Sequence, residues 1–260
     1  MNINLNADLG ESFGAWTMGE DVALLQVVGT ANIACGFHAG DPLVMRTTVR
    51  TALAAGVSLG AHPAYPDLQG FGRRPMKMAP AELEAAIIYQ IGALAAMAAA
   101  EGGRLTHVKP HGALNNQACE DAALADTVAR AVRAIDRELI LLAPARSEMI
   151  TAGQRAGLAV AAEIFADRAY NDSANLVPRS QPGAVIHDPD EVVAHVMRML
   201  DSGCIVAQSG KRLPTHFHSI CVHGDTPGAV TNARRLRGAI ETAGWTLTGL
   251  PAVLAESVQA

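Results

Sequence analysis

The sequence predicts an α/β fold in which residues 1–260 form a single domain, a parallel (β/α) barrel of about seven strands. Short apolar segments alternate with helical ones about seven times, the pattern of parallel strands joined by right-handed crossovers. No linker or change of composition divides the 260 residues, and a length near ~250 residues suits one barrel. The first segment alternates polar and apolar residues, which a strand with its polar face lining a closed barrel explains.

The first strand, residues 1–8, is the segment around which the site is expected to be built. Its apolar face carries Ile3, Leu5 and Ala7, and its polar face carries Asn4, Asn6 and Asp8. Asp8 ends the alternation, so its carboxylate is expected at the carboxyl end of the strand, where parallel α/β folds place their sites. We therefore predict that Asp8 and Glu11 form the floor of an active site. The alternative is that Asp8 only forms a turn or caps a helix.

The first half of the chain gives clear boundaries. A helix with acidic residues in its first turn is expected at 19–28, and a short apolar strand at 31–35. Pro42 starts the next helix and Gly56 ends it. Further strands are expected at 57–60 and 105–112, separated by a long polar loop at 65–78 and a helix at 80–102.

The second half continues the alternation. Helices are expected at 121–135, 146–155, 190–200 and 229–243, and strands at 139–143, 159–165 and 219–222. The segment 139–143 is wholly apolar, as in a parallel strand covered on both faces. Residues 204–218 are expected to hold an extra hairpin, and residues 245–250 an edge strand.

The composition predicts a cytoplasmic protein with a large core. Half of the residues are hydrophobic, only 17% are charged, and the net charge of −5 argues against nucleic acid as a partner. The four cysteines have no metal-binding spacing, which indicates free thiols in a reducing compartment. No signal peptide is visible, and the apolar segment 85–100 is too short for a comfortable membrane span, so it indicates a buried helix.

Ionisable residues follow six of the seven expected strands. They are Asp8 and Glu11, His38 and Asp41, His62, Lys109 and His111, Asp167 and Arg168, and His223 and Asp225. Because the carboxyl ends of all barrel strands meet at one mouth, these groups are expected to converge there. We predict an enzyme site, with solvated loop charges as the alternative.

Several standard chemistries lack their motifs. No Gly-x-Ser-x-Gly elbow and no dinucleotide-binding glycine motif is present, and Ser209-Gly-Lys-Arg lacks the glycine that a phosphate loop requires at position 205. Any nucleotide would therefore bind without a Walker motif. Two chemistries stay open: a divalent metal held by Asp8, His38 and His62, or metal-free acid–base catalysis by the same residues.

Six ordered blocks resemble the lactam-utilisation (LamB/YcsF) family of 5-oxoprolinase A subunits. They cover residues 6–14, 31–41, 60–63 with 70–74, 108–114, 165–168 and 221–225, and one departure is Asn115, where the family more often has tyrosine. The resemblance implies a seven-stranded, TIM-like barrel related to the polysaccharide deacetylase-type barrel. It also implies ATP-dependent opening of 5-oxo-L-proline (pyroglutamate) to L-glutamate, together with two partners, subunits B and C.

This reaction suggests a role for each candidate residue. ATP would activate the stable lactam amide by phosphorylating its oxygen, so the site needs cations for anionic groups and a base for water. Lys109, Arg73 and Arg74 are the candidates for the first task, and Asp8 or Glu11, steered by His38 or His62, for the second. His111 and Asp225 join the predicted catalytic group, and Asp41, Asp167, Arg168 and His223 the predicted substrate- or phosphate-binding group.

The structural alternatives are plain. Arg73 and Arg74 would be a solvated pair, and Lys109 a structural partner of Asp8 or Glu163. His107 and His195 are expected to be structural. Two rival functions also stay open: a metal-dependent deacetylase of N-acetylated sugars, and a non-catalytic subunit that only binds the lactam.

Overall fold

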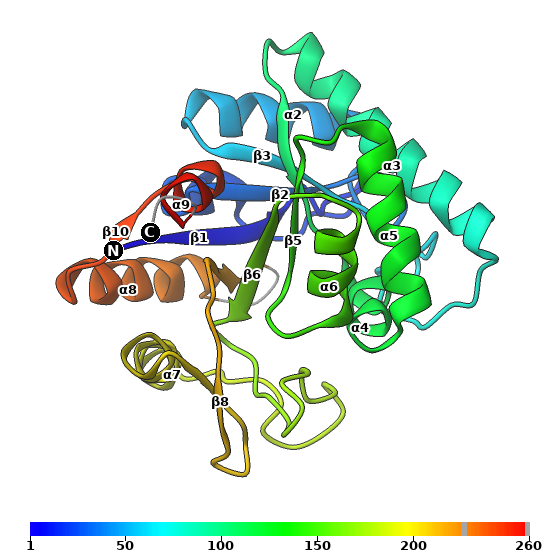
Figure 1. Cartoon of the computed structure of the whole chain (residues 1–260). Helices are drawn as coiled ribbons and strands as arrows, with labels where there is room; N and C mark the ends of the chain where they lie inside the picture. The colour runs from blue at the N-terminus through cyan, green and yellow to red at the C-terminus, as the bar shows by residue number, and fades with distance from the viewer. Residues whose placement is uncertain (225–227, 258–260) are drawn as a thin grey trace.

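The computed structural model describes residues 1–224 and 228–257, and its centre is a closed barrel of seven parallel strands (Figure 1). In barrel order these are β1 (Asn2–Leu9), β2 (Thr30–Ala34), β3 (Ser58–His62), β4 (Leu105–Val108), β5 (Ile140–Pro144), β6 (Val160–Phe165) and β9 (Ser219–Val222). Pairing of β9 with β1 closes the ring. The predicted seven-stranded parallel barrel is confirmed.

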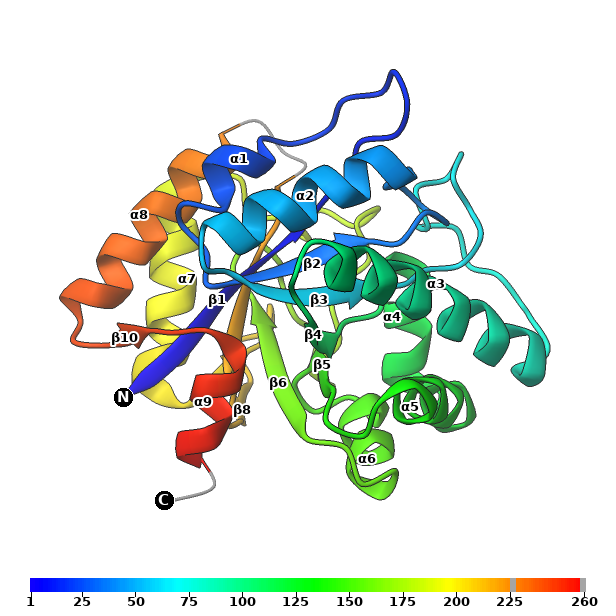
Figure 2. The same cartoon turned by 90° about the horizontal axis from the view of Figure 1, so that it is seen from above.

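Helices surround the strands, as the view turned by 90° shows (Figure 2). They are α1 (Asp21–Leu24), α2 (Pro42–Ala54), α3 (Pro80–Ala100), α4 (Gly112–Glu120), α5 (Ala122–Ile135), α6 (Glu148–Arg155), α7 (Pro189–Ser202), α8 (Ala229–Thr242) and α9 (Leu250–Ser257). Asp41, Asp121 and Asp188 cap the first turns of α2, α5 and α7 with their side chains. The sequence prediction makes α1 too long and omits α4 and α9.

The expected extra pieces are also present. β7 (Cys204–Val206) and β8 (Arg212–Pro214) form an antiparallel hairpin, and β10 (Thr246–Leu247) pairs with the start of β1. Figure 1 shows the hairpin, α7 and the irregular segment after β6 projecting together beneath the barrel. This projection forms one wall of the cavity described below.

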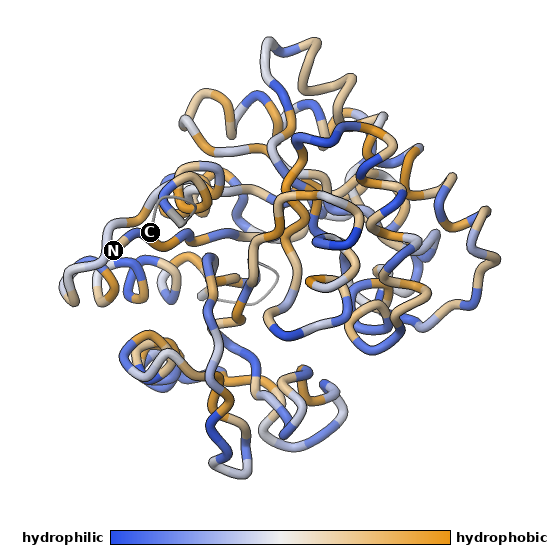
Figure 3. The backbone as a smooth tube through the Cα atoms, viewed as in Figure 1, coloured by the Kyte–Doolittle hydropathy of each residue, from blue (hydrophilic) through white to orange (hydrophobic). Residues whose placement is uncertain are grey.

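Apolar residues run along the strands and the inner sides of the helices, while the turns are more hydrophilic (Figure 3). Helix α3 is long and apolar enough to cross a membrane on length and composition alone. Its Leu83, Ile87, Ile91 and Leu94 are buried, and the helix packs on α5 and β3. Packing against the barrel accounts for that apolar face.

The interior of the barrel is polar, as the first strand predicted. Asn4, Asn6, Asn32, His107, Glu163 and Ser219 are all fully buried there. They hydrogen-bond to one another across strands: Asn6 Nδ2 donates to Glu163 Oε1 at 2.8 Å, and His107 Nε2 lies 2.9 Å from Asn32 Oδ1. Gly60 makes room for this packing, because a Cβ at residue 60 would lie 2.0 Å from His107 Nε2.

Candidate active site

A cavity of about 610 Å³ opens at the carboxyl ends of the strands. Eight of the predicted site residues line it: Asp8, Glu11, His62, Arg73, Lys109, His111, Arg168 and His223. The residues come from the ends of β1 and β3, from the segments just after β1, β4, β6 and β9, and from the loop before α3, so convergence at one mouth is observed. Helix α4 and the segment after β6 supply the two side walls.

Two histidines at the floor of the cavity turn ring nitrogens toward each other. His62 Nδ1 lies 2.6 Å from the Lys109 carbonyl, and His111 Nε2 lies 2.8 Å from the Phe71 carbonyl. A carbonyl only accepts, so these two nitrogens carry the protons and donate. The other two ring nitrogens, His62 Nε2 and His111 Nδ1, face each other at 3.0 Å. A proton on one of them, or a metal ion bound by both, satisfies this contact.

Glu11 and His38 complete an electron-rich group around these histidines. Glu11 Oε1 lies 3.3 Å from His38 Nε2 and 3.6 Å from His111 Nδ1, and the His38 and His111 rings stack at 3.9 Å. One ligand atom from each of Glu11, His38, His62 and His111 lies within 4.8 Å of the other three. Burial lowers the pKa of His38 and of His111 well below the usual value, which keeps both imidazoles neutral. Three imidazoles and one carboxylate fit a divalent transition metal.

This group differs from the predicted triplet of Asp8, His38 and His62. Asp8 Oδ2 does lie 3.4 Å from His62 Nε2, but the atoms that gather most tightly around His38 are those of Glu11 and His111. Asp8 instead belongs to a second group with Cys221 and His223. The Lys109 ammonium, 3.0 Å from both Asp8 Oδ1 and Cys221 Sγ, already supplies a positive charge there. The histidine group is therefore the better metal candidate.

Lys109 sits between two buried carboxylates. Its Nζ lies 3.0 Å from Asp8 Oδ1 and 3.0 Å from Glu163 Oε1. Burial alone would raise the pKa of Asp8, but His62 and Lys109 outweigh burial and hold that pKa well below its usual range. Burial alone would likewise lower the pKa of Lys109, yet Asp8, Cys221 and Glu163 raise it well above normal. Asp8 and Lys109 are therefore both charged at neutral pH.

Asp167 and His223 form a dyad on another side of the cavity. His223 Nδ1 lies 2.7 Å from Asp167 Oδ1 and 2.9 Å from Oδ2, so its N–H donates a hydrogen bond to the carboxylate. Burial would raise the pKa of Asp167, but His223 and the nearby arginines lower it overall. Held this way, His223 directs its other ring nitrogen, Nε2, away from Asp167, and an imidazole oriented by a carboxylate suits proton transfer.

The loop before α3 brings His111 and Arg73 into place. Asp67 accepts hydrogen bonds from Gly70 N at 3.0 Å and from the Arg74 guanidinium, so Arg74 fixes the loop and does not line the cavity. Gly72, at a φ of +63°, lies so close that a Cβ would approach His111 Cδ2 to 2.8 Å. Arg73 does line the cavity, with its guanidinium 4.9 Å from the centre of the Phe71 ring.

Three further predicted residues have other surroundings. Asp41 caps α2 and also accepts from Gly14 N at 2.7 Å, outside the cavity. Arg168 is buried and donates to the carbonyls of Val177 and Ala184, at 2.6 Å and 3.2 Å. Asp225 lies outside the described residues.

The sequence gives little indication that two further residues, Glu163 and Arg179, belong to the site. It gives Glu163 only as a possible partner of Lys109, although Glu163 is fully buried and its Oε2 has no hydrogen bond. The place of Glu163 inside an otherwise apolar strand is the available signal. Arg179 also lines the cavity, but it lies in an irregular loop where no pattern marks it.

The chain resembles known proteins along nearly its whole length. A family profile described as the LamB/YcsF family matches residues 3–255. A protein of Azoarcus sp. (strain BH72), named as a 5-oxoprolinase A subunit, is 79% identical over 251 residues, which cover 96% of this chain and 98% of that protein. A name that designates one lettered subunit implies that such relatives work in a multi-subunit complex.

Solved structures are similar as well. The crystal structure of a lactam utilization protein from Thermus thermophilus has a TM-score of 0.90 and 44% identity, covering 96% of this chain and 100% of that one. A structure of T48 deacetylase with substrate has a TM-score of 0.51 at 12% identity, covering 98% and 92%, which shows a shared deacetylase-type barrel and nothing more. From the profile match and the 79% identity, the chain belongs to the LamB/YcsF family.

Proposed function

We propose that this chain is the A subunit of an ATP-dependent 5-oxoprolinase. With subunits B and C, in the cytoplasm, it would open the lactam of 5-oxo-L-proline to L-glutamate as ATP is hydrolysed. The observation that carries the proposal is the group of Glu11, His38, His62 and His111, of which all but His38 line the same cavity as the Asp8–Lys109 pair. That cavity belongs to a chain closely similar to a relative named as a 5-oxoprolinase A subunit.

The chemistry explains why ATP is needed. Resonance stabilises the lactam amide, and transfer of the ATP γ-phosphoryl group to the amide oxygen makes the ring carbon electrophilic. Water then adds to this carbon, and the ring nitrogen leaves with a proton to open the ring. A second water releases phosphate from the resulting acyl phosphate, which gives glutamate, ADP and phosphate.

The side chains of the cavity divide these tasks. His223, oriented by Asp167, accepts a proton from water or returns one to the ring nitrogen. Asp8 is a weak base because its pKa is depressed, so its role is to hold negative charge beside His62 and Lys109. Glu11 is the second carboxylate that lines the cavity, and Lys109 and Arg73 stabilise developing negative charge.

The histidine group is the place for a divalent cation. Glu11, His38, His62 and His111 would hold it, and when bound it would polarise an oxygen of the substrate or of water. The close approach of the four residues supports this assignment, because one ligand atom from each lies within 4.8 Å of the others.

Glutamate release from 5-oxoproline with ATP tests the proposal. We expect turnover when the chain is mixed with subunits B and C, and little or none from any one of them alone, because this chain has no Walker motif. Rapid lactam opening by the isolated chain would overturn the need for partners. Absence of turnover in the complete mixture would overturn the reaction itself.

A metal-dependent deacetylase of N-acetylated sugars is the second candidate, and the histidine group favours it. That function would be supported if the purified chain contained stoichiometric Zn²⁺ and released acetate from an N-acetylated sugar oligomer. A chain that binds 5-oxoproline but leaves turnover unchanged when Asp8 and His223 are replaced would instead be a non-catalytic binding subunit.

A further inference from the structure

Four cationic side chains line the cavity: Arg73, Lys109, Arg168 and Arg179. Three of them already have partners within the protein. Lys109 is held by two carboxylates, Arg168 donates to two backbone carbonyls, and Arg73 lies over the Phe71 ring.

Arg179 differs from these three. It is exposed, and within residues 1–224 and 228–257 it makes no hydrogen bond and no ion pair. Its charge helps to lower the pKa of Asp167, but it makes no ion-pair contact with that carboxylate, so its planar guanidinium, which matches carboxylate and phosphate oxygens, is available to a ligand.

The backbone around Arg179 is fixed although the segment is irregular. The buried guanidinium of Arg168 bonds to the carbonyl of Val177 on one side of Arg179 and to that of Ala184 on the other. Val177 N also donates to the Ala169 carbonyl at 2.9 Å, and Gln181 N donates to the Pro178 carbonyl at 2.9 Å. Arg168 therefore acts as a positioning residue that holds the loop carrying Arg179 at the cavity.

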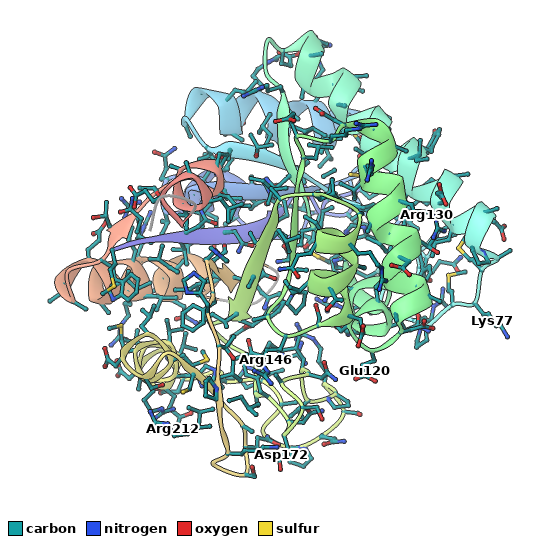
Figure 4. The ribbon with its side chains drawn as sticks, viewed as in Figure 1. Lys77, Glu120, Arg130, Arg146, Asp172 and Arg212 are labelled. Atoms are coloured by element: carbon teal, nitrogen blue, oxygen red, sulfur yellow. The ribbon has the colours of Figure 1, made fainter. Side chains whose placement is uncertain are left out.

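The arrangement gives the cavity two different walls. Residues 174–179 form one, and α4, which ends at Glu120, forms another. Figure 4 labels Asp172, on the segment that leads into the first wall, and Glu120 at the end of α4. The electron-rich histidine group lies at the floor. A ligand with one anionic group would thus place it at Arg179 and its reacting end toward the floor.

We propose that Arg179 is the anion anchor of this cavity, binding the carboxylate of the lactam substrate or a phosphate group of the nucleotide. The identity of the ligand rests on the proposed function, whereas the presence of an anion site does not. Arg168 supports the anchor through the backbone and does not touch the ligand.

The test compares Arg179→Ala with Arg212→Ala in the enzyme assembled with its partner subunits. Arg212 is also exposed, but it lies on the β7–β8 hairpin, away from the residues that line the cavity (Figure 4). Arg179→Ala should raise one KM by about tenfold, the usual scale for losing a charge-assisted hydrogen bond. A rise in the KM for 5-oxoproline identifies the carboxylate, and a rise in the KM for ATP identifies a phosphate. Arg212→Ala should change neither KM.

The neutral carboxamide of 5-oxoproline provides a second readout for the carboxylate. If the carboxylate is the ligand, wild type should prefer the acid over the carboxamide in a competition assay, and Arg179→Ala should lose that preference. Both KM values unchanged in Arg179→Ala, or changed equally in Arg212→Ala, would overturn the anchor.

Failure of the proposed function would be seen separately. If the assembled wild-type enzyme does not turn over 5-oxoproline, calorimetric titration of the chain with pyrophosphate still tests the anion site. Wild type and Arg212→Ala should then bind pyrophosphate, and Arg179→Ala should bind it about tenfold more weakly. Equal binding by all three proteins, or no binding by any, would refute the site.

Discussion

Replacing Asp8 by asparagine distinguishes a functional carboxylate from a structural one. The substitution keeps the volume of the side chain and an oxygen that can accept from Lys109, but it removes the negative charge beside His62. If Asp8 holds charge at the reacting centre, turnover by the assembled enzyme should fall by about 10²-fold or more.

The stability cost follows from the partners of Lys109. Removing one member of a buried ion pair costs roughly 3–5 kcal/mol when the other is left uncompensated. Lys109 keeps Glu163 at 3.0 Å, so it is not left alone. We therefore expect the free energy of unfolding to fall by only about 1.5–3 kcal/mol, the range for a hydrogen bond to a charged group.

The pH dependence gives an independent check with a definite sign. Because His62 and Lys109 depress the pKa of Asp8 in the folded state, its contribution to stability is present above the unfolded pKa of about 3.9. It is lost as pH falls through the lower folded value. The stability difference between wild type and Asp8→Asn should thus be constant above about pH 5 and narrow below about pH 4.

Urea unfolding and glutamate release should be measured on the same preparations. Asp201→Asn is the matched control, because Asp201 is exposed at the end of α7 and outside the cavity, so its effect should stay within about 0.5 kcal/mol. The catalytic role of Asp8 would be refuted if Asp8→Asn lowered the free energy of unfolding by more than ~3 kcal/mol while its folded fraction kept full activity.

Three further predictions concern the same interior. Lys109→Met leaves buried carboxylates without a cation, so it should lower the free energy of unfolding in urea by roughly 3–5 kcal/mol. Adding Glu163→Gln should restore part of that loss. A double variant no more stable than Lys109→Met alone would contradict the role of this ion pair. Wild-type chain dialysed against Zn²⁺ should retain about one equivalent by elemental analysis, and His111→Ala should retain far less; equal retention would rule out the histidine group. Burial lowers the pKa of His107 to about 3 and of His195 to about 4, so protons bind mainly to the unfolded state as pH falls below about 6.5. The two histidines together should lower the free energy of unfolding by roughly 4 kcal/mol between pH 7 and pH 5. Equal urea midpoints at the two pH values would contradict this.

The sequence predicts the barrel well because strand alternation and strand exits are local patterns. Three features follow from nearest neighbours in the chain: the polar face of the first strand, the histidines at or after the ends of β2, β3 and β4, and the Pro-started helices α2 and α3. Helix α4 escapes prediction because Gly112, at a φ of +55°, opens it directly after a strand exit that resembles a loop. Its first turn is fixed by tertiary contact, since Ala113 N donates to the Gly72 carbonyl at 2.8 Å.

The finer assignment of the site depends on the folded chain. Arg73 and Arg74 are adjacent and chemically alike, and only the position of Asp67 decides that Arg74 fixes the loop while Arg73 lines the cavity. In the same way, Glu11 and not Asp8 joins the histidine group, because the β1 exit turns toward His38. The position of Arg179 at the cavity depends on Arg168 and on the path of a long loop, and no local sequence pattern predicts that path.

The position of 5-oxoproline in a crystal structure of the assembled enzyme tests the central claim most directly. The account predicts that the lactam lies in the 610 Å³ cavity, with its amide facing Glu11, His62 and His111 and its anionic end toward the wall that carries Arg179. A lactam bound within a partner subunit, with this cavity filled only by solvent, would contradict it.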